Sequence, residues 1–187
     1  MGAERINLSV FRAINNLAGK NELLDALMVF CAKYLVFLFL FCLIFFWFVK
    51  KGAYKKAVLF SLMSAVIGSG INILIRLFYF HPRPFMLNTG TILIKHNLGS
   101  SFPSAHTTLM LCIAFVFLYY KETRTAGLIL SLFGLIGGMA RVFCGVHFPF
   151  DVFGSIILTT AVSLFVYKIR EKIKRIFSFL GSFLDFC

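Results

Sequence analysis

Five apolar segments, each close to the length of a lipid bilayer, constrain the fold of this chain more than any other feature. A membrane-spanning helix needs roughly 20 predominantly apolar residues. The chain has 187 residues, of which 60% are hydrophobic and 14% charged, whereas soluble domains average roughly 25% charged residues. The sequence therefore predicts an all-α, polytopic membrane helix bundle with about five transmembrane helices. The expected spans cover residues 28–49, 57–75, 104–120, 125–140 and 149–167.

The segments outside these spans are polar or basic. Residues 5–19 place apolar side chains at helical spacing between asparagines and arginines, which predicts an amphipathic helix that lies on the membrane or packs against the bundle. Residues 168–187 form a basic tail. Glu4 and Arg5 give no indication of a cleavable signal peptide. We interpret residues 1–187 as one membrane domain.

Glycine pairs inside two spans predict close helix packing. Gly68 and Gly70 lie in the second span, and Gly134 and Gly138 lie in the fourth at a small-xxx-small spacing. Small residues at these intervals let helix backbones approach each other inside a membrane.

The net charge of +12 indicates membrane topology rather than nucleic-acid binding, because the basic residues cluster at the ends of apolar segments. Eleven lysines and arginines lie in the 50–56 loop, the 121–124 loop and the tail, against eight at the other end. The positive-inside rule therefore predicts a cytoplasmic C-terminus. All four histidines then face the extracytoplasmic side.

Three short motifs converge on that outer side. The first holds two arginines separated by six residues, the second is Pro-Ser-Ala-His, and the third holds an arginine, a histidine and an aspartate within eleven residues. Together they supply Arg76, Arg83, Ser104, Ala105, His106, Arg141, His147 and Asp151. One guanidinium group can bind two phosphate oxygens at once, and it stays positively charged at physiological pH. The motifs therefore predict a pocket for a multiply charged anion, which the start of a helix at Ser104 would also favour.

The residue types favour phosphoryl transfer without a metal or cofactor. The 76–103 loop has no Asp or Glu, so a carboxylate-bridged metal site is hard to assemble there. Asp151 follows His147 by four residues and can fix the tautomer that leaves one ring nitrogen free to attack. His106 is the natural acid for the leaving oxygen.

The three motifs, in the order R-x6-R-P, P-S-x-H and R-x5-H-x3-D, resemble the signature of the type 2 phosphatidic acid phosphatase superfamily. The resemblance implies that His147 attacks phosphorus, that Asp151 orients it, and that His106 protonates the leaving group. It further implies that the phosphate is held by Arg76, Arg83, Ser104 and Arg141, with help from the Ala105 and His106 amides.

The chain departs from the family pattern at three positions. Arg76 stands where lysine is usual, Ala105 where glycine is usual, and Ala140 where a serine commonly precedes the motif arginine. Arg76 keeps the positive charge but changes the geometry of the donor group. Ala105 adds a methyl group at a position where a tight backbone contact is expected, and Ala140 lacks the hydroxyl of the usual serine.

Within the superfamily, residues 81–85 and 101–108 look most like bacterial undecaprenyl pyrophosphate phosphatases of the bacitracin-resistance type. That resemblance implies a polyprenyl diphosphate substrate, membrane lipids as surroundings, no nucleic acid and no obligatory protein partner. It also implies a role in lipid-carrier recycling for the cell wall. Two alternatives stay open: a phosphatase for glycerol-based lipid phosphates, such as phosphatidic acid or phosphatidylglycerophosphate, and a non-enzymatic anion channel or transporter.

The remaining histidines and the cysteines are interpreted as structural. His81 and His96 match no motif position, so we expect solvated loop residues. The five cysteines have no metal-ligand spacing and are interpreted as small buried apolar residues: Cys31, Cys42, Cys112, Cys144 and Cys187.

Overall fold

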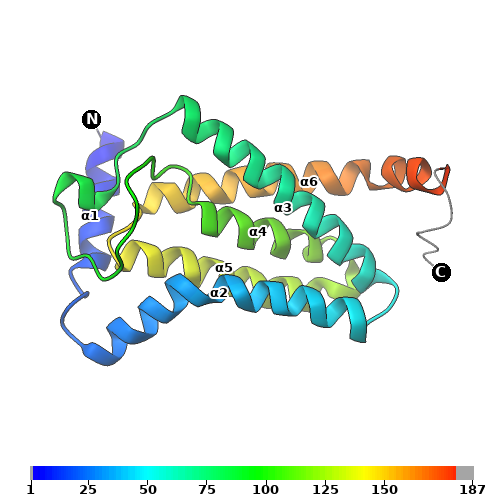
Figure 1. The fold of residues 1–187 in the computed structure, drawn as a ribbon, viewed down its shortest axis with the longest axis horizontal. Coiled ribbons are helices and arrows are strands. Elements are labelled where there is room, and N and C mark those ends of the chain that lie inside the picture. Colours follow the sequence, from blue (N-terminus) through cyan, green and yellow to red (C-terminus); the bar gives the residue numbers. More distant parts are fainter. Residues whose placement is uncertain (1, 180–187) are drawn as a thin grey trace.

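The computed structural model describes residues 2–179, and within that range the chain folds into helices without a β-strand. Five long helices run side by side, and a sixth lies across one end of the bundle (Figure 1). The helices are α1 Gly2–Asn15, α2 Glu22–Val49, α3 Ala53–Phe78, α4 Ala105–Leu118, α5 Arg124–Phe143 and α6 Pro149–Phe179, with 3₁₀ helices η1 Pro84–Leu87 and η2 Lys121–Thr123. The all-α prediction is confirmed. Cys187 and the end of the basic tail lie outside the described residues.

Four helices in the described part are long and apolar enough to cross a membrane: α2, α3, α5 with η2, and α6 as far as Ile173. The third predicted span, residues 104–120, corresponds to α4, which is shorter than a typical membrane-spanning helix. α4 has 14 residues, which at 1.5 Å per residue is about 21 Å against a hydrocarbon thickness of about 30 Å. It still connects the two ends of the bundle, because the chain enters it at the α1 end and leaves it at the other (Figure 1).

The loop between α3 and α4 makes up the missing length. α4 is the central helix, with most of its residues buried against α3, α5 and α6. Ahead of it, Ser100, Ser101, Pro103 and Ser104 are also buried. The loop therefore folds into the end of the bundle, and its polar groups bond to other loops and helices rather than to lipid, as irregular backbone at membrane depth must.

Glycines allow α4 to lie close to both neighbours, as the sequence predicted. A Cβ atom on Gly134 would lie 2.7 Å from the Leu111 side chain, and one on Gly138 would lie 2.9 Å from Thr107 Oγ1. On α3, a Cβ on Gly68 would lie 2.4 Å from Cys112 Sγ. Gly70 has open space around it, so only the first glycine of that pair serves packing.

The N-terminal helix α1 packs against the bundle end. Asn15 is buried, and its Nδ2 donates to the carbonyl oxygens of Thr91 (2.8 Å) and Phe143 (2.7 Å), while its Oδ1 accepts from Thr91 N (2.7 Å). Phe11 is also buried and meets Phe148 edge-on, with ring centroids 5.2 Å apart. Of the two placements predicted for this helix, the structure has the packed one, and α1 holds together the loops that surround the motif residues.

Candidate active site

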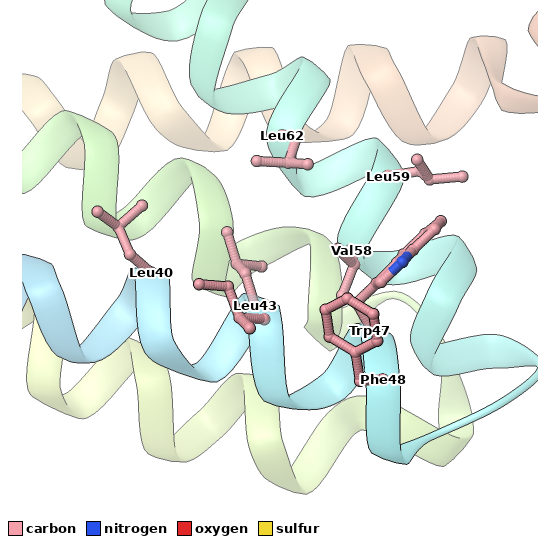
Figure 2. Close-up of a pocket in the computed structure, with 8 residues that line it drawn as sticks. Leu40, Leu43, Trp47, Phe48, Val58, Leu59 and Leu62 are labelled. Atoms are coloured by element: carbon pink, nitrogen blue, oxygen red, sulfur yellow. The ribbon is translucent and has the colours of Figure 1, made fainter.

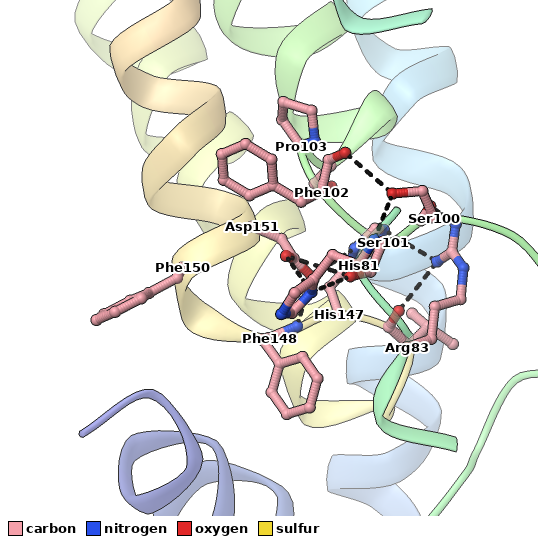
Figure 3. A network of polar contacts seen from close by, with 12 residues as sticks. His81, Arg83, Ser100, Ser101, Phe102, Pro103, His147, Phe148, Phe150 and Asp151 are labelled. Atoms are coloured by element: carbon pink, nitrogen blue, oxygen red, sulfur yellow. Dashed lines mark hydrogen bonds and ion pairs between the residues drawn. The ribbon is translucent and has the colours of Figure 1, made fainter. Parts of the chain in front are cut away.

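The predicted His147–Asp151 pair forms at the turn from α5 into α6. His147 lies in that turn and Asp151 in the first turn of α6, where the positive end of a helix favours a carboxylate. His147 Nδ1 is 3.2 Å from Asp151 Oδ2, which also accepts from the backbone N of Phe148 at 2.8 Å. Both side chains are almost completely buried, so the ring is held from one side in a fixed orientation (Figure 3).

The other face of the His147 ring meets Arg83. Arg83 Nη1 is 3.4 Å from His147 Nε2 and donates to Val146 O at 3.0 Å. A guanidinium can only donate hydrogen bonds, so Nε2 carries the lone pair. The ring proton is then on Nδ1, facing the carboxylate. The geometry assigns the tautomer that leaves Nε2 free.

The charge states follow from burial and from neighbouring cations. Burial lowers the pKa of His147 well below its ordinary value, and the nearby Arg141 and Arg83 lower it further, so the ring stays neutral at physiological pH. Burial, together with repulsion from Arg76, lowers the pKa of Arg83 to about 10, although Asp151 acts in the opposite direction. The guanidinium therefore stays charged.

Arg76 and Arg83 meet at a single acceptor. One Nη2 from each donates to the carbonyl oxygen of Ser100, although the two side chains repel each other. Arg83 Nε is buried and has no hydrogen-bond partner in the described chain. Two cations on one neutral carbonyl leave positive charge uncompensated, which is the condition for binding an anion.

Arg141 contributes a third cation, from inside a helix. α5 extends to Phe143, beyond the expected end of the span at residue 140, so Arg141 belongs to its last turn. Its Nη1 donates to Ala32 O of α2 at 3.1 Å, and its Nε is buried without a partner in the described residues. This contact anchors the side chain and leaves donors for a ligand.

The second motif begins α4, but its residues are less directly engaged. Ser104 occupies the N-cap position, yet its hydroxyl accepts from Thr107 Oγ1 (3.0 Å) and makes no capping bond. Its backbone N donates to Asp151 O at 3.2 Å, which fixes α4 against α6. Ala105 is exposed. The half-buried side chain of His106 makes no hydrogen bond in the described structure, although Arg141 and Arg83 lie within electrostatic range. The start of α4 is therefore open to a ligand.

The expectation that His81 is a solvated loop residue is wrong. Its side chain is 24% exposed, and its Nδ1 is 3.6 Å from Asp151 Oδ1. Ser101 links the two: its Oγ is 2.8 Å from His81 Nδ1 and donates to Asp151 Oδ1 at 3.3 Å. Asp151 thus lies between two histidines (Figure 3). His81 is two residues from a motif arginine, but its contact with Ser101, twenty residues away, depends on the path of an irregular loop.

His96 and the cysteines behave as expected. His96 is exposed, and its Nδ1 contacts only the Asn97 carbonyl. Cys112 and Cys144 are buried, Cys31 and Cys42 are half-buried, and all four are free thiols. Within residues 2–179, no three His, Cys, Asp or Glu side chains are grouped as metal ligands.

A comparison with protein families supports the resemblance that the three motifs indicate. The model of the PAP2 superfamily matches residues 54–175, which include all three motifs and helices α4 and α5. The chain belongs to the PAP2 superfamily.

PAP2 relatives cover most of this chain. Undecaprenyl-diphosphatase BcrC of Bacillus subtilis is 34% identical over 169 residues, which are 90% of this chain and 86% of that protein. The crystal structure of Aquifex aeolicus LpxE has a TM-score of 0.74 at 31% identity, covering 87% of this chain and 95% of the other. A PAP2-type phosphatidylglycerolphosphate phosphatase structure from Bacillus subtilis has a TM-score of 0.68 at 20% identity, covering 93% and 89% respectively, and supports the fold alone.

This PAP2 protein is a multi-pass membrane lipid phosphatase, a hydrolase acting on phosphate esters or anhydrides. Because the chain belongs to a family of phosphatases, the enzyme prediction is retained over the alternative of a non-enzymatic anion channel or transporter.

Proposed function

We propose that residues 1–187 act as one phosphatase domain that hydrolyses undecaprenyl diphosphate to undecaprenyl phosphate and inorganic phosphate. One observation carries the chemistry. His147 is buried and neutral, its Nδ1 faces Asp151, and its free Nε2 faces Arg83. A nucleophile positioned this way beside a phosphate-binding cation suits phosphoryl transfer through a covalent intermediate.

In the first step, His147 Nε2 attacks the terminal phosphorus. A P–N bond forms, the P–O bond to the bridging oxygen breaks, and His106 gives its proton to that oxygen. An incoming diphosphate favours the protonated, cationic form of His106 because opposite charges attract. In the second step His106 takes a proton from water, the hydroxide attacks phosphorus, and the P–N bond breaks to release phosphate. No metal takes part.

Cations and amides hold the phosphate during both steps. Arg76, Arg83 and Arg141 supply charge, and the open start of α4 supplies the Ala105 and His106 amides at a helix N-terminus. Ser104 holds this helix end against α6. The buried Nε atoms of Arg83 and Arg141, which lack partners in the described chain, support this assignment.

The choice of a polyprenyl diphosphate rests on the 34% identical relative named undecaprenyl-diphosphatase and on the number of cations, since three arginines suit two linked phosphates. Such an enzyme would recycle the cell-wall lipid carrier and oppose bacitracin, which sequesters the diphosphate. The second candidate is a glycerol-based lipid phosphate, favoured by a Bacillus subtilis relative named Phosphatidylglycerophosphatase B, which is 32% identical over 91 residues.

A rate comparison tests the substrate. Purified protein in one detergent is given undecaprenyl diphosphate, phosphatidylglycerophosphate and phosphatidic acid, and phosphate release is measured. We expect kcat/KM to be at least about tenfold higher for the polyprenyl diphosphate, a difference of about 1.4 kcal/mol in transition-state binding. Faster turnover of either glycerolipid would overturn the substrate while leaving the phosphatase chemistry intact.

We also propose that the site faces the extracytoplasmic side, with the C-terminal helix end in the cytoplasm. Arg76, Arg83 and Arg141 account for three of the eight basic residues at the site end and are engaged in the site. Without them, the excess at the opposite end becomes eleven to five, which strengthens the topology signal. Asn88 is exposed at the site end. An Asn88→Cys variant in intact cells should react with an impermeant maleimide, and labelling only after lysis would invert the topology.

His81 is expected to act as a positioning residue. His81→Ala should lower kcat by about tenfold with KM nearly unchanged, because Asp151 loses a neighbour that helps to fix its carboxylate. His81→Asn places an amide nitrogen near the former Nδ1 and should restore most of the activity.

The matched control is His96→Ala, which removes an exposed histidine from the same loop and should leave kcat within about twofold of wild type. If His81→Ala behaves like His96→Ala, or if His81→Asn is as impaired as the alanine variant, the contact with Asp151 has no positioning role.

A further inference from the structure

An apolar groove lies between α2 and α3 (Figure 2). The turn that joins these two helices is at the opposite end of the bundle from α1 and the start of α4 (Figure 1). The volume of the groove is about 410 Å³, and nearly all of its surface is apolar. Leu43, Trp47, Val58 and Leu62 are among the residues that line it. Leu62 is 44% exposed, and in a bilayer the groove is therefore open to lipid chains.

Four lysines lie between the two groups of residues that line this groove, residues 40–48 and 58–62. Lys50, Lys51, Lys55 and Lys56 lie on the α2–α3 turn and the first turn of α3. None of them pairs with a carboxylate in the described structure, where the ion pairs involve other residues. Gly52 also provides no side-chain cap for α3. Positive charge at this end is thus left for an external anion.

Trp47 contacts both the groove and one of the lysines. Its ring lines the cavity, and Lys55 Nζ lies over the same ring, 5.2 Å from the centroid. Lys50 Nζ lies 5.7 Å above the Tyr54 ring. The contact with Trp47 holds one ammonium group beside the groove, and the contact with Tyr54 holds a second one on the adjoining turn. Indole and phenol rings are typical of the boundary between hydrocarbon and water.

We propose that the groove and these lysines form a binding site for one anionic glycerophospholipid, with an acyl chain in the groove and the headgroup phosphate on the lysines. An acyl chain matches the apolar lining, and a headgroup with net negative charge matches the cluster of cations better than a zwitterionic one. Basic residues at a membrane surface bind anionic lipid with a gain equivalent to about fivefold per lysine. The site is separate from the phosphatase centre and does not depend on its substrate.

Trp47 is the only tryptophan in the sequence, so the intrinsic fluorescence of the protein reports on lipid bound in the groove. Protein is reconstituted in phosphatidylcholine vesicles that contain rising fractions of phosphatidylglycerol with brominated acyl chains, and quenching of Trp47 fluorescence is measured. Brominated phosphatidylcholine at equal fractions gives the reference. We expect a saturable preference for phosphatidylglycerol of about tenfold or more.

Substitutions separate the headgroup from the groove. Lys55→Gln with Lys56→Gln should reduce the preference to below about threefold, whereas Lys121→Gln, at the same end of the bundle but outside the α2–α3 turn, should leave it unchanged. Leu62→Phe narrows the groove and should weaken quenching by both lipids. Each variant is checked for unchanged phosphatase activity, which shows that the fold is intact.

Three results would overturn the proposal: equal quenching by the two lipids in the wild type, a preference that survives loss of both lysines, and a Trp47 signal insensitive to either lipid in a protein that sediments as a dimer. The last result would assign the groove to a second copy of the chain. None of the three bears on the proposed active site, whose tests use different residues and readouts.

Discussion

His147→Ala is expected to lower phosphate release by on the order of 10⁴-fold or more, because it removes the atom that would bond to phosphorus. The neighbouring cations and amides would still bind the phosphate, so KM should change far less than kcat. Phosphate release from undecaprenyl diphosphate, measured on purified protein, gives both constants.

Two further measurements test whether His147 is the nucleophile and whether a metal takes part. Rapid quenching at alkaline pH should trap a phosphorylated wild-type protein, because a phosphohistidine is a phosphoramidate that is stable to base. The same treatment of His147→Ala should yield no phosphorylated protein. Wild-type activity should persist in EDTA. Near-normal turnover by the variant would eliminate His147 as the nucleophile, and loss of wild-type activity in EDTA would require a metal in the reaction.

Asp151→Asn is expected to lower kcat by about 10³-fold while leaving the fold in place. In the wild type one oxygen, Oδ2, accepts from both His147 Nδ1 and Phe148 N. An amide keeps the shape but offers a donor in place of one acceptor oxygen. It also carries no negative charge, so it no longer stabilises the cationic ring that forms when Nε2 bonds to phosphorus.

The control for this substitution lies one turn further along α6. Ser155 is buried and donates to the carbonyl oxygens of Ser104 (3.0 Å) and Asp151 (2.9 Å). Ser155→Ala removes neighbouring hydrogen bonds without touching the carboxylate and should lower kcat by less than about threefold. Circular dichroism and thermal unfolding confirm folding of both variants. Equal losses in kcat would mean that Asp151 serves only to hold α6 in place.

The central pairing was predictable from sequence because it is local. His147 lies in the turn before α6 and Asp151 in the first turn of that helix, four residues later, so a short local turn brings them into contact. The residue type of Arg83 predicts a phosphate ligand, and that role stays a prediction. The contact of Arg83 with Nε2, which indicates the tautomer, was not predictable, because it joins segments 64 residues apart.

Contacts that depend on the path of the loop could not be predicted. The link from His81 through Ser101 to Asp151 requires two loop segments and a helix end to meet. The anchoring of Arg141 on Ala32 O likewise joins positions 109 residues apart. Hydropathy predicted α4 close to its observed bounds, as residues 104–120 against Ala105–Leu118. It did not predict that the loop ahead of α4 is buried, because hydropathy does not distinguish residues that face protein from those that face lipid.

The docking of α1 has a consequence for the order in which the protein is made. Asn15 is synthesised long before its partners Thr91 and Phe143, which follow it by 76 and 128 residues. At about 5–20 residues per second, α1 waits several seconds or more for these partners. An amphipathic helix without its partner binds to the membrane surface, so we expect α1 to dock only after the end of α5 has been synthesised. Variants that weaken Asn15 should therefore accumulate as inserted but inactive protein.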